Sequence, residues 1–361
     1  MLTPYGTNLK MHIEGGSHDE KIELILDGFP AGMQVDEAAL QAFMQRRAPG
    51  QNAFSTTRKE ADKPVFLSGL TDGVTEGGRI HAVIYNSNQH SSDYSFVKET
   101  PRPSHADFTA IRKYGPDVDL RGGGHYSGRL TAMLCVAGAL CKQYLSERGI
   151  EVFAHIHSIG GIADTPFDLC KVGKNEQKAL AKADFPVLNA QQGQKMQEKI
   201  LAAKKNLDSV GGVVECAVTG LPVGLGEHLF AGVEGRIAAA VFSIPAVKGV
   251  EFGNGFGCAS LFGSQNNDPF CTDGQNIYTK TNNCGGILGG MTNGMPLVFR
   301  AAFKPTPSIA KEQDTVSLSK MENTKLRIKG RHDPCIVQRA VPVTEAAAAV
   351  AVCDLLLDRG Q

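Results

Sequence analysis

The chain has 361 residues, of which 42% are hydrophobic, and it carries 37 basic and 37 acidic side chains. A chain of this size and composition buries a large core, as globular enzymes do. Zero net charge argues against a nucleic-acid-binding protein with a broad basic face, so any cationic site has to be local. The nine cysteines form no Cys-X-X-Cys pair, and the first residues do not resemble a signal peptide. We therefore expect a cytoplasmic protein that neither crosses a membrane nor binds nucleic acid.

The first third of the chain predicts one capped helix and an antiparallel strand pair. Asp36 is a suitable N-cap for a helix that runs to Arg47, where basic residues suit the helix dipole, and Pro49 follows. Two β-rich runs, 65–67 and 80–85, flank a glycine-containing segment, which predicts that they pair as antiparallel strands.

Later segments continue the mixture of helices and strands. A helix is expected over 127–145, solvated helix and loop over 171–205, a strand over 213–218, a helix around 238–241 and a packed C-terminal helix around 346–352. No sequence repeat is evident. The α+β mixture has no obvious linker, and the length of the chain fits one large domain or two ordinary ones.

A short segment, 121–129 (RGGGHYSGR), places two guanidiniums, an imidazole and two hydroxyls around three glycines. It is either an ordinary flexible loop or a cradle in which backbone N–H groups and cations meet an anion. The helix expected after it directs its positive end at the glycines, which favours the cradle.

Three histidines lie in segments rich in polar residues or glycine. Beside His105, Asp107 is positioned to orient the imidazole, and Arg102 disfavours its protonation. His18 follows two glycines and His332 lies in 330–335 (GRHDPC). Taken alone, His105 and His18 are more typical of surface loops. The arginine, carboxylate and thiol so close to His332 are unusual for a plain turn.

His155 and His157 alternate on a predicted strand. A zinc site there would need two further ligands, and none is apparent in the sequence. Core packing is the better interpretation, and we predict no metal.

Cations near glycine or proline are scattered along the chain, at Arg47, Arg58, Arg102, Arg121, Arg129, Lys248, Lys304, Arg331 and Arg339. They are either surface charges or parts of one polyanion pocket. No P-loop motif is present, and 253–257 (GNGFG) lacks the spacing of a dinucleotide fingerprint.

Several motifs, in order and across nearly the whole chain, resemble chorismate synthase. They are 102–107 (RPSHAD), 121–124 (RGGG), 221–227 (LPVGLGE), 243–253 (SIPAVKGVEFG), 285–290 (GGILGG), 304–309 (KPTPSI) and 330–335 (GRHDPC). The resemblance implies a single domain over residues 1–361, with an α+β fold that is a β-α-β sandwich assembled as a homotetramer. It also implies a carbon-oxygen lyase that removes phosphate and a C6 hydrogen from 5-enolpyruvylshikimate 3-phosphate to give chorismate, with reduced FMN as cofactor. The chain has no space for an appended flavin reductase, so an external reductant is expected.

The resemblance also assigns roles to individual residues. His18 matches the histidine that protonates the departing phosphate, His105 the one that protonates reduced flavin, and Asp333 an acidic partner of the flavin. Arg47 and Arg129 match the substrate side. The matching flavin contacts are His125, Tyr126, Ser127, Pro245, Ala246, Gly289, Lys304, Pro305, Thr306, Pro307, Ser308 and Arg331.

Some positions depart from the family pattern. The usual Gly-Glu-Ser-His-Gly reads Gly15-Gly-Ser-His-Asp19, which moves a carboxylate across His18. Other departures are Ala48, Ala53, His125, Tyr126 and Leu130. Each lost charge-assisted contact costs about 1.5–3 kcal/mol, so we expect weaker binding rather than different chemistry. Two alternatives stay open: a degenerate paralogue that binds flavin or a phosphorylated metabolite without turnover, and a different flavoenzyme such as a reductase.

Overall fold

The computed structural model describes residues 4–50, 62–86, 96–328 and 333–358. Its strands are β1 (Lys10–Gly15), β2 (Lys21–Asp27), β3 (Val65–Ser68), β4 (Leu70–Thr71), β5 (Val74–Thr75), β6 (Ile80–Tyr85), β7 (Glu151–Ile159), β8 (Ile162–Ala163), β9 (Gly212–Thr219), β10 (Val247–Phe252), β11 (Phe270–Thr272), β12 (Ile277–Thr279), β13 (Ile287–Leu288), β14 (Met291–Thr292), β15 (Leu297–Phe303), β16 (Gln313–Ser317) and β17 (Glu322–Leu326). Its α-helices are α1 (Glu37–Arg47), α2 (Asp107–Tyr114), α3 (Thr131–Ser146), α4 (Lys174–Lys182), α5 (Ala190–Lys205), α6 (Val233–Phe242), α7 (Gly263–Asn266) and α8 (Val337–Asp358). Short 3-10 helices are η2 (Arg121–Tyr126), η3 (Gly128–Leu130), η4 (Leu229–Ala231) and η5 (Gly255–Ser260).

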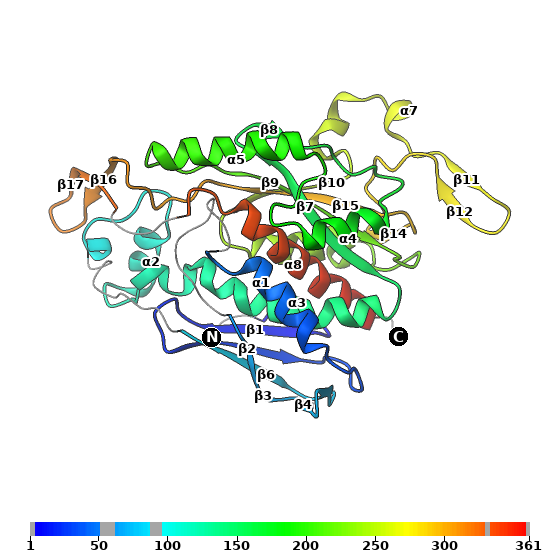
Figure 1. The fold of residues 1–361 in the computed structure, drawn as a ribbon, viewed down its shortest axis with the longest axis horizontal. Helices are drawn as coiled ribbons and strands as arrows, with labels where there is room; N and C mark the ends of the chain where they lie inside the picture. Colours follow the sequence, from blue (N-terminus) through cyan, green and yellow to red (C-terminus); the bar gives the residue numbers. More distant parts are fainter. Residues whose placement is uncertain (1–3, 51–61, 87–95, 329–332, 359–361) are drawn as a thin grey trace.

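Two antiparallel sheets enclose a layer of helices (Figure 1). One sheet has the order β1-β2-β6-β3 and the other β10-β15-β9-β7-β8. Helices α3 and α8 pack against each other between them, with α3 contacting β1, β2 and β6 and α8 contacting β7 and β9. The main hydrophobic core runs from Leu9 to Leu356 and draws on both sheets. This arrangement confirms the predicted α+β class and the β-α-β sandwich.

Local sequence signals account for several elements. The Asp36 side chain caps α1 by accepting from Ala39 N at 2.9 Å, as its position predicts. The predicted pair of runs is confirmed as β3 and β6, which are antiparallel with a bulge between Phe66 and Ser68. The strand expected over 213–218 and the helix around 238–241 are confirmed as β9 and α6.

The helix after the glycine cluster starts later than expected. Ser127 caps η3 by accepting from Arg129 N at 3.2 Å, so the tight turn over 128–130 precedes α3, which begins at Thr131. The C-terminal helix begins earlier than its alanine run indicates, at Val337, and contains Pro342. By length and composition α8 is apolar enough to cross a membrane, but most of it is buried between the two sheets.

A buried carboxylate links the helical layer to a sheet. Glu345 of α8 is 1% exposed and accepts from Arg46 of α1 at 2.7 and 2.9 Å, from Lys142 of α3 at 2.7 Å and from the Ala154 N–H of β7 at 3.1 Å. Burial favours the neutral acid, but the two cations outweigh it and lower the pKa of Glu345 to about 2. Four elements are therefore held together by one ionised side chain.

The closest helix contact should be sensitive to a single methyl group. A Cβ on Gly138 of α3 would overlap the Cβ and Cα atoms of Ala346 in α8. We expect Gly138→Ala to lower the free energy of unfolding by about 1–3 kcal/mol through overpacking, although alanine favours helices.

Gly235→Ala in α6 is the matched control, because the nearest heavy atom to its new Cβ is 4.0 Å away. Its melting temperature should equal or exceed that of the parent chain, whereas that of Gly138→Ala should fall. Equal melting temperatures for the two variants would contradict the packing described for α3 and α8.

Candidate active site

A cavity of about 580 Å³ lies where the segment after β1, the loop before α2, the glycine cluster and the ends of β15 and α8 come together. Among its lining residues are six of the nine scattered cations: Arg47, Arg102, Arg129, Lys248, Lys304 and Arg339. Within the described residues, Asp333 is the one carboxylate that lines it. Convergence thus favours the polyanion pocket over dispersed surface charges.

Of the other three cations, Arg121 lies within the described residues and does not line the cavity. Arg121 turns away to the Asp119 carboxylate, with its Nε atom 2.9 Å from Oδ1, and its side chain is 46% exposed. Of the three glycine amides, that of Gly123 donates to Leu120 O at 3.0 Å. Arg129 therefore lines the cavity and Arg121 does not, and anion binding by the glycine amides stays a prediction. Arg58 and Arg331 lie outside the described residues.

Arg47 and Arg129 are buried and converge on one carboxylate. Arg47 Nη1 donates to Asp62 Oδ2 at 2.7 Å, and Arg129 Nη1 donates to Asp62 Oδ1. Burial raises the pKa of Asp62, but the two guanidiniums outweigh it and lower the pKa overall. Arg47 also donates to Thr131 Oγ1 at 3.2 Å, and Arg129 to Asn86 Oδ1 at 3.0 Å. The two arginines predicted for the substrate side thus share a preorganised position that suits an acidic group.

A second buried carboxylate orients His105. Asp107 accepts from Arg102 Nε and Nη2, each at 2.7 Å, and from His105 Nδ1 at 2.8 Å. Burial opposes ionisation, but these bonds hold the pKa of Asp107 well below its usual range. An ionised carboxylate only accepts, so His105 carries its proton on Nδ1, and Nε2 is left for the cavity. The sequence-based expectation for Asp107 and His105 agrees with this geometry.

The glycine cluster lies between two of the predicted catalytic histidines. A Cβ on Gly122 would overlap the His18 ring, and one on Gly123 would lie 3.4 Å from His105 Nε2. Both glycines have positive φ, +58° and +98°. Glycine is required at 122 because its backbone lies against the His18 ring, and at 123 because of the positive φ. His18 is 6% exposed and packs behind Gly122, whereas His105 lines the cavity.

Hydrogen bonds also join the glycine cluster to the end of β1 and the turn after it. Ser17 N donates to Gly124 O at 3.3 Å, and His125 Nδ1 lies 2.7 Å from Gly15 O. Because a carbonyl only accepts, His125 donates through Nδ1. Together with Tyr126 and Ser127, His125 lines the cavity as predicted for flavin contacts.

Lys304 joins two residues with strained backbones at the cavity wall. Ser104 and Ala246 have φ of +58° and +77°, which is uncommon for non-glycine residues. The amide of Lys304 donates to Ala246 O at 2.9 Å, and its ammonium donates to Ser104 O. Burial and the nearby Lys248 ammonium lower the pKa of Lys304, so a bound anion between the two lysines would be stabilised.

Most of the other predicted residues line the same cavity. They are Pro245, Ala246, Thr306, Pro307, Ser308 and Asp333. Asp333 pairs with Arg339, which also donates to Arg47 O at 3.0 Å. Pro305 and Gly289 are not among the lining residues, and Gly289 lies in the turn between β13 and β14. His332, Arg331 and Ala53 lie outside the described residues.

The Asp19 carboxylate, which follows His18 in the sequence, lies close to Gly16 in the structure. A Cβ on Gly16 would lie 3.0 Å from Asp19 Oδ2. Asp19 therefore places a carboxylate next to residue 16, the position where the family usually has glutamate. Of the other departures, Ala48 is 1% exposed and Leu130 packs against the core, so neither contributes a charge to the site.

Asp62 is the functional residue that sequence reasoning missed. It lies in a charged run, 58–63 (RKEADK), that resembles a solvated loop. No sequence signal distinguishes it from its neighbours, because its role depends on arginines 15 and 67 residues away.

Comparisons with known proteins point to one family. The sequence model of the family described as chorismate synthase matches residues 9–357. A chorismate synthase of Dehalococcoides mccartyi is 45% identical over 96% of this chain and 94% of its own, and one of Methanosarcina barkeri is 43% identical over 99% and 96%. A solved structure titled as a crystal structure of chorismate synthase superposes with a TM-score of 0.77 at 29% identity, covering 98% of this chain and 93% of that one. The chain therefore belongs to the chorismate synthase family.

Proposed function

We propose that the chain converts 5-enolpyruvylshikimate 3-phosphate to chorismate, with reduced FMN bound beside the substrate. The convergence of six cations on one cavity is the observation that carries this proposal. The substrate has two carboxylates and a phosphate, and the flavin adds a phosphate of its own. Three carboxylates, Asp62, Asp107 and Asp333, contact cations of this set in the described residues, so positive charge remains in excess. Two polyanions would supply the missing negative charge.

The residues present fit a flavin and its phosphate. Gly122, His125, Tyr126 and Ser127 line the cavity, and the neighbouring ammonium groups of Lys248 and Lys304 favour an anion. His125, Tyr126, Ser127, Pro245, Ala246 and the 304–308 segment, with Gly289 and Arg331, are the residues proposed to hold it. When bound, reduced flavin supplies electron density that assists departure of the phosphate.

The proposed roles of the chain's own groups combine their positions with the family resemblance. Arg47 and Arg129 line the cavity and would orient the substrate's anionic groups. His18 is not among the lining residues, so its role as proton donor to the departing phosphate rests on the resemblance. His105 would donate from Nε2, which faces the cavity, when the ring carries protons on both nitrogens, and Asp107 holds the one on Nδ1. Asp333, paired with Arg339, accepts a proton. In the overall reaction the C–O bond to phosphate and the C6–H bond break, the C6 hydrogen leaves as a proton, the phosphate takes up a proton, and a new C=C bond forms, so no net oxidation occurs.

An exposed apolar arm supports the proposed homotetramer. The segment from η5 through the β11–β12 hairpin projects from the rest of the fold (Figure 1) and exposes Phe256 by 87%, Phe262 by 78%, Phe270 by 65% and Ile277 by 72%. Apolar side chains exposed to this extent mark an interaction surface. Gly289, outside the cavity of its own subunit, would reach a flavin from a neighbouring one.

A reducing environment and an external source of reduced flavin complete the proposal. All nine cysteines lie within the described residues and are free thiols, five of them buried. This supports a cytoplasmic location.

An anaerobic assay tests the reaction directly. Purified protein, pre-reduced FMN and 5-enolpyruvylshikimate 3-phosphate should yield chorismate and phosphate in a 1:1 ratio, with no nicotinamide cofactor consumed, because the elimination requires no net electrons. Oxidised FMN without a reductant is the control. Flavin binding without chorismate would favour the degenerate paralogue, and stoichiometric nicotinamide oxidation would favour a reductase.

Asp107→Asn should slow the reaction without removing the pocket. The amide no longer fixes the proton on His105 Nδ1, so we expect kcat to fall about 10- to 100-fold while flavin affinity is nearly retained. The His105 tautomer, read by nitrogen NMR, should change as well. Asp117→Asn, in the exposed loop after α2, is the matched control and should leave kcat and tautomer as they are. An unchanged kcat and tautomer in Asp107→Asn would disprove the positioning role.

A further inference from the structure

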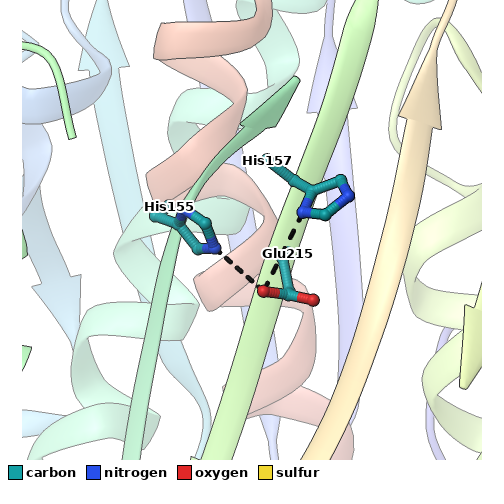
Figure 2. A group of neighbouring side chains, drawn as sticks. All are labelled: His155, His157 and Glu215. Carbon is teal, nitrogen blue, oxygen red and sulfur yellow. Dashed lines mark hydrogen bonds and ion pairs between the residues drawn. The ribbon is translucent and has the colours of Figure 1, made fainter. Parts of the chain in front are cut away.

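A second polar cluster lies on the five-stranded sheet, away from the cavity. His155 and His157 of β7 and Glu215 of β9 point toward one another (Figure 2). His155 Nε2 is 2.9 Å and His157 Nδ1 is 4.0 Å from Glu215 Oε2. Each residue offers one ligand atom that lies within 4.8 Å of those of the other two. None of the three residues lines the cavity.

Strand register brings these residues together from distant parts of the sequence. His155 pairs directly with Glu215 across β7 and β9, and a bulge between Ile156 and Ser158 leaves His157 as the extra residue. Bulges re-aim side chains next to functional sites. His157 Nδ1 is buried and has no hydrogen-bond partner among the described residues. Such a buried nitrogen lone pair is costly unless something binds it.

An outer carboxylate already fixes the orientation of His155. Asp164 Oδ2 lies 3.0 Å from His155 Nδ1, and Asp164 itself accepts from Leu188 N at 2.6 Å and Asn189 N at 2.8 Å. Metal-binding histidines commonly donate their second N–H to a carboxylate in this way, which leaves the other nitrogen for the ion. Glu215 is likewise anchored, by the Phe167 N–H at 2.7 Å.

Charge balance also favours a dication. Without one, His155 must carry protons on both nitrogens to donate to Asp164 and Glu215, and the cluster keeps one net negative charge. With a dication and two neutral imidazoles, the two carboxylates are fully compensated. The cation that faces the cluster from β15, Arg300, is paired with Glu251 at 3.0 Å.

We propose that His155, His157 and Glu215 bind one divalent transition-metal ion of the Zn²⁺ class, with Asp164 in support. Two imidazoles and a carboxylate suit such ions. Bond lengths of about 2.0–2.2 Å would place tetrahedral ligand atoms roughly 3.3–3.5 Å apart, between the two separations found here. His157, with a side chain 17% exposed, provides the entry path and a water the fourth ligand. The ion would tie β7 to β9 and stabilise the fold.

The test uses chelator-treated full-length protein and Co²⁺ as a spectroscopic probe. We expect one Co²⁺ per subunit, with visible bands of a four-coordinate nitrogen and oxygen site, displaced stoichiometrically by Zn²⁺. His157→Ala removes one ligand whose Nδ1 makes no hydrogen bond in the described structure, so the fold should persist while affinity falls at least about tenfold. Zn²⁺ should raise the melting temperature of the parent chain and not that of this variant.

His228→Ala is the matched control, because that side chain is 73% exposed and contacts Glu227 instead. It should bind Co²⁺ as tightly as the parent. Equal affinity in His157→Ala, an octahedral spectrum typical of an adventitious ion, or a sulfur-to-cobalt band that places the ion on a cysteine would each overturn the proposal.

Discussion

Two buried carboxylates, Asp62 and Asp107, hold three of the arginines around the cavity in place. Asp62 fixes Arg47 and Arg129, and Asp107 fixes Arg102 together with His105. Because each carboxylate keeps a low pKa despite burial, the cations behind the cavity wall stay paired when no ligand is bound. The same arrangement preorganises hydrogen-bond donors before a polyanion arrives, so little reorganisation is needed on binding.

Buried carboxylates also bind side chains of neighbouring elements at two further places in the fold. Glu345 joins α1, α3, α8 and β7 in the helical layer, while on the other face of the same sheet Asp164 and Glu215 hold His155. Arg46 and Arg47 are adjacent in α1, yet Arg46 pairs with Glu345 and Arg47 pairs with Asp62. Helix geometry separates neighbouring side chains by roughly a quarter of a turn, so the two arginines point in different directions.

Features encoded locally could be predicted from the sequence. The Asp36 cap, the β3–β6 pair and the link between Asp107 and His105 depend on residues close in the chain or on hydrophobic pattern. The start of α3 was predicted too early because the 3-10 turn after Ser127 has no distinctive pattern. Asp62 and Glu215 could not be assigned, since their partners are set by packing and strand register. The family motifs identified most of the cavity wall, but they could not show that Arg121 turns outward to Asp119.

The central claim is that a single cationic cavity accepts two polyanions together. A crystal structure of the protein with FMN and 5-enolpyruvylshikimate 3-phosphate tests it most directly. The account predicts both ligands in the cavity, with the flavin against the 304–308 segment and the substrate toward Arg47 and Arg129, between His105 and Asp333. Flavin bound at a different surface, or substrate density away from these arginines, would contradict it.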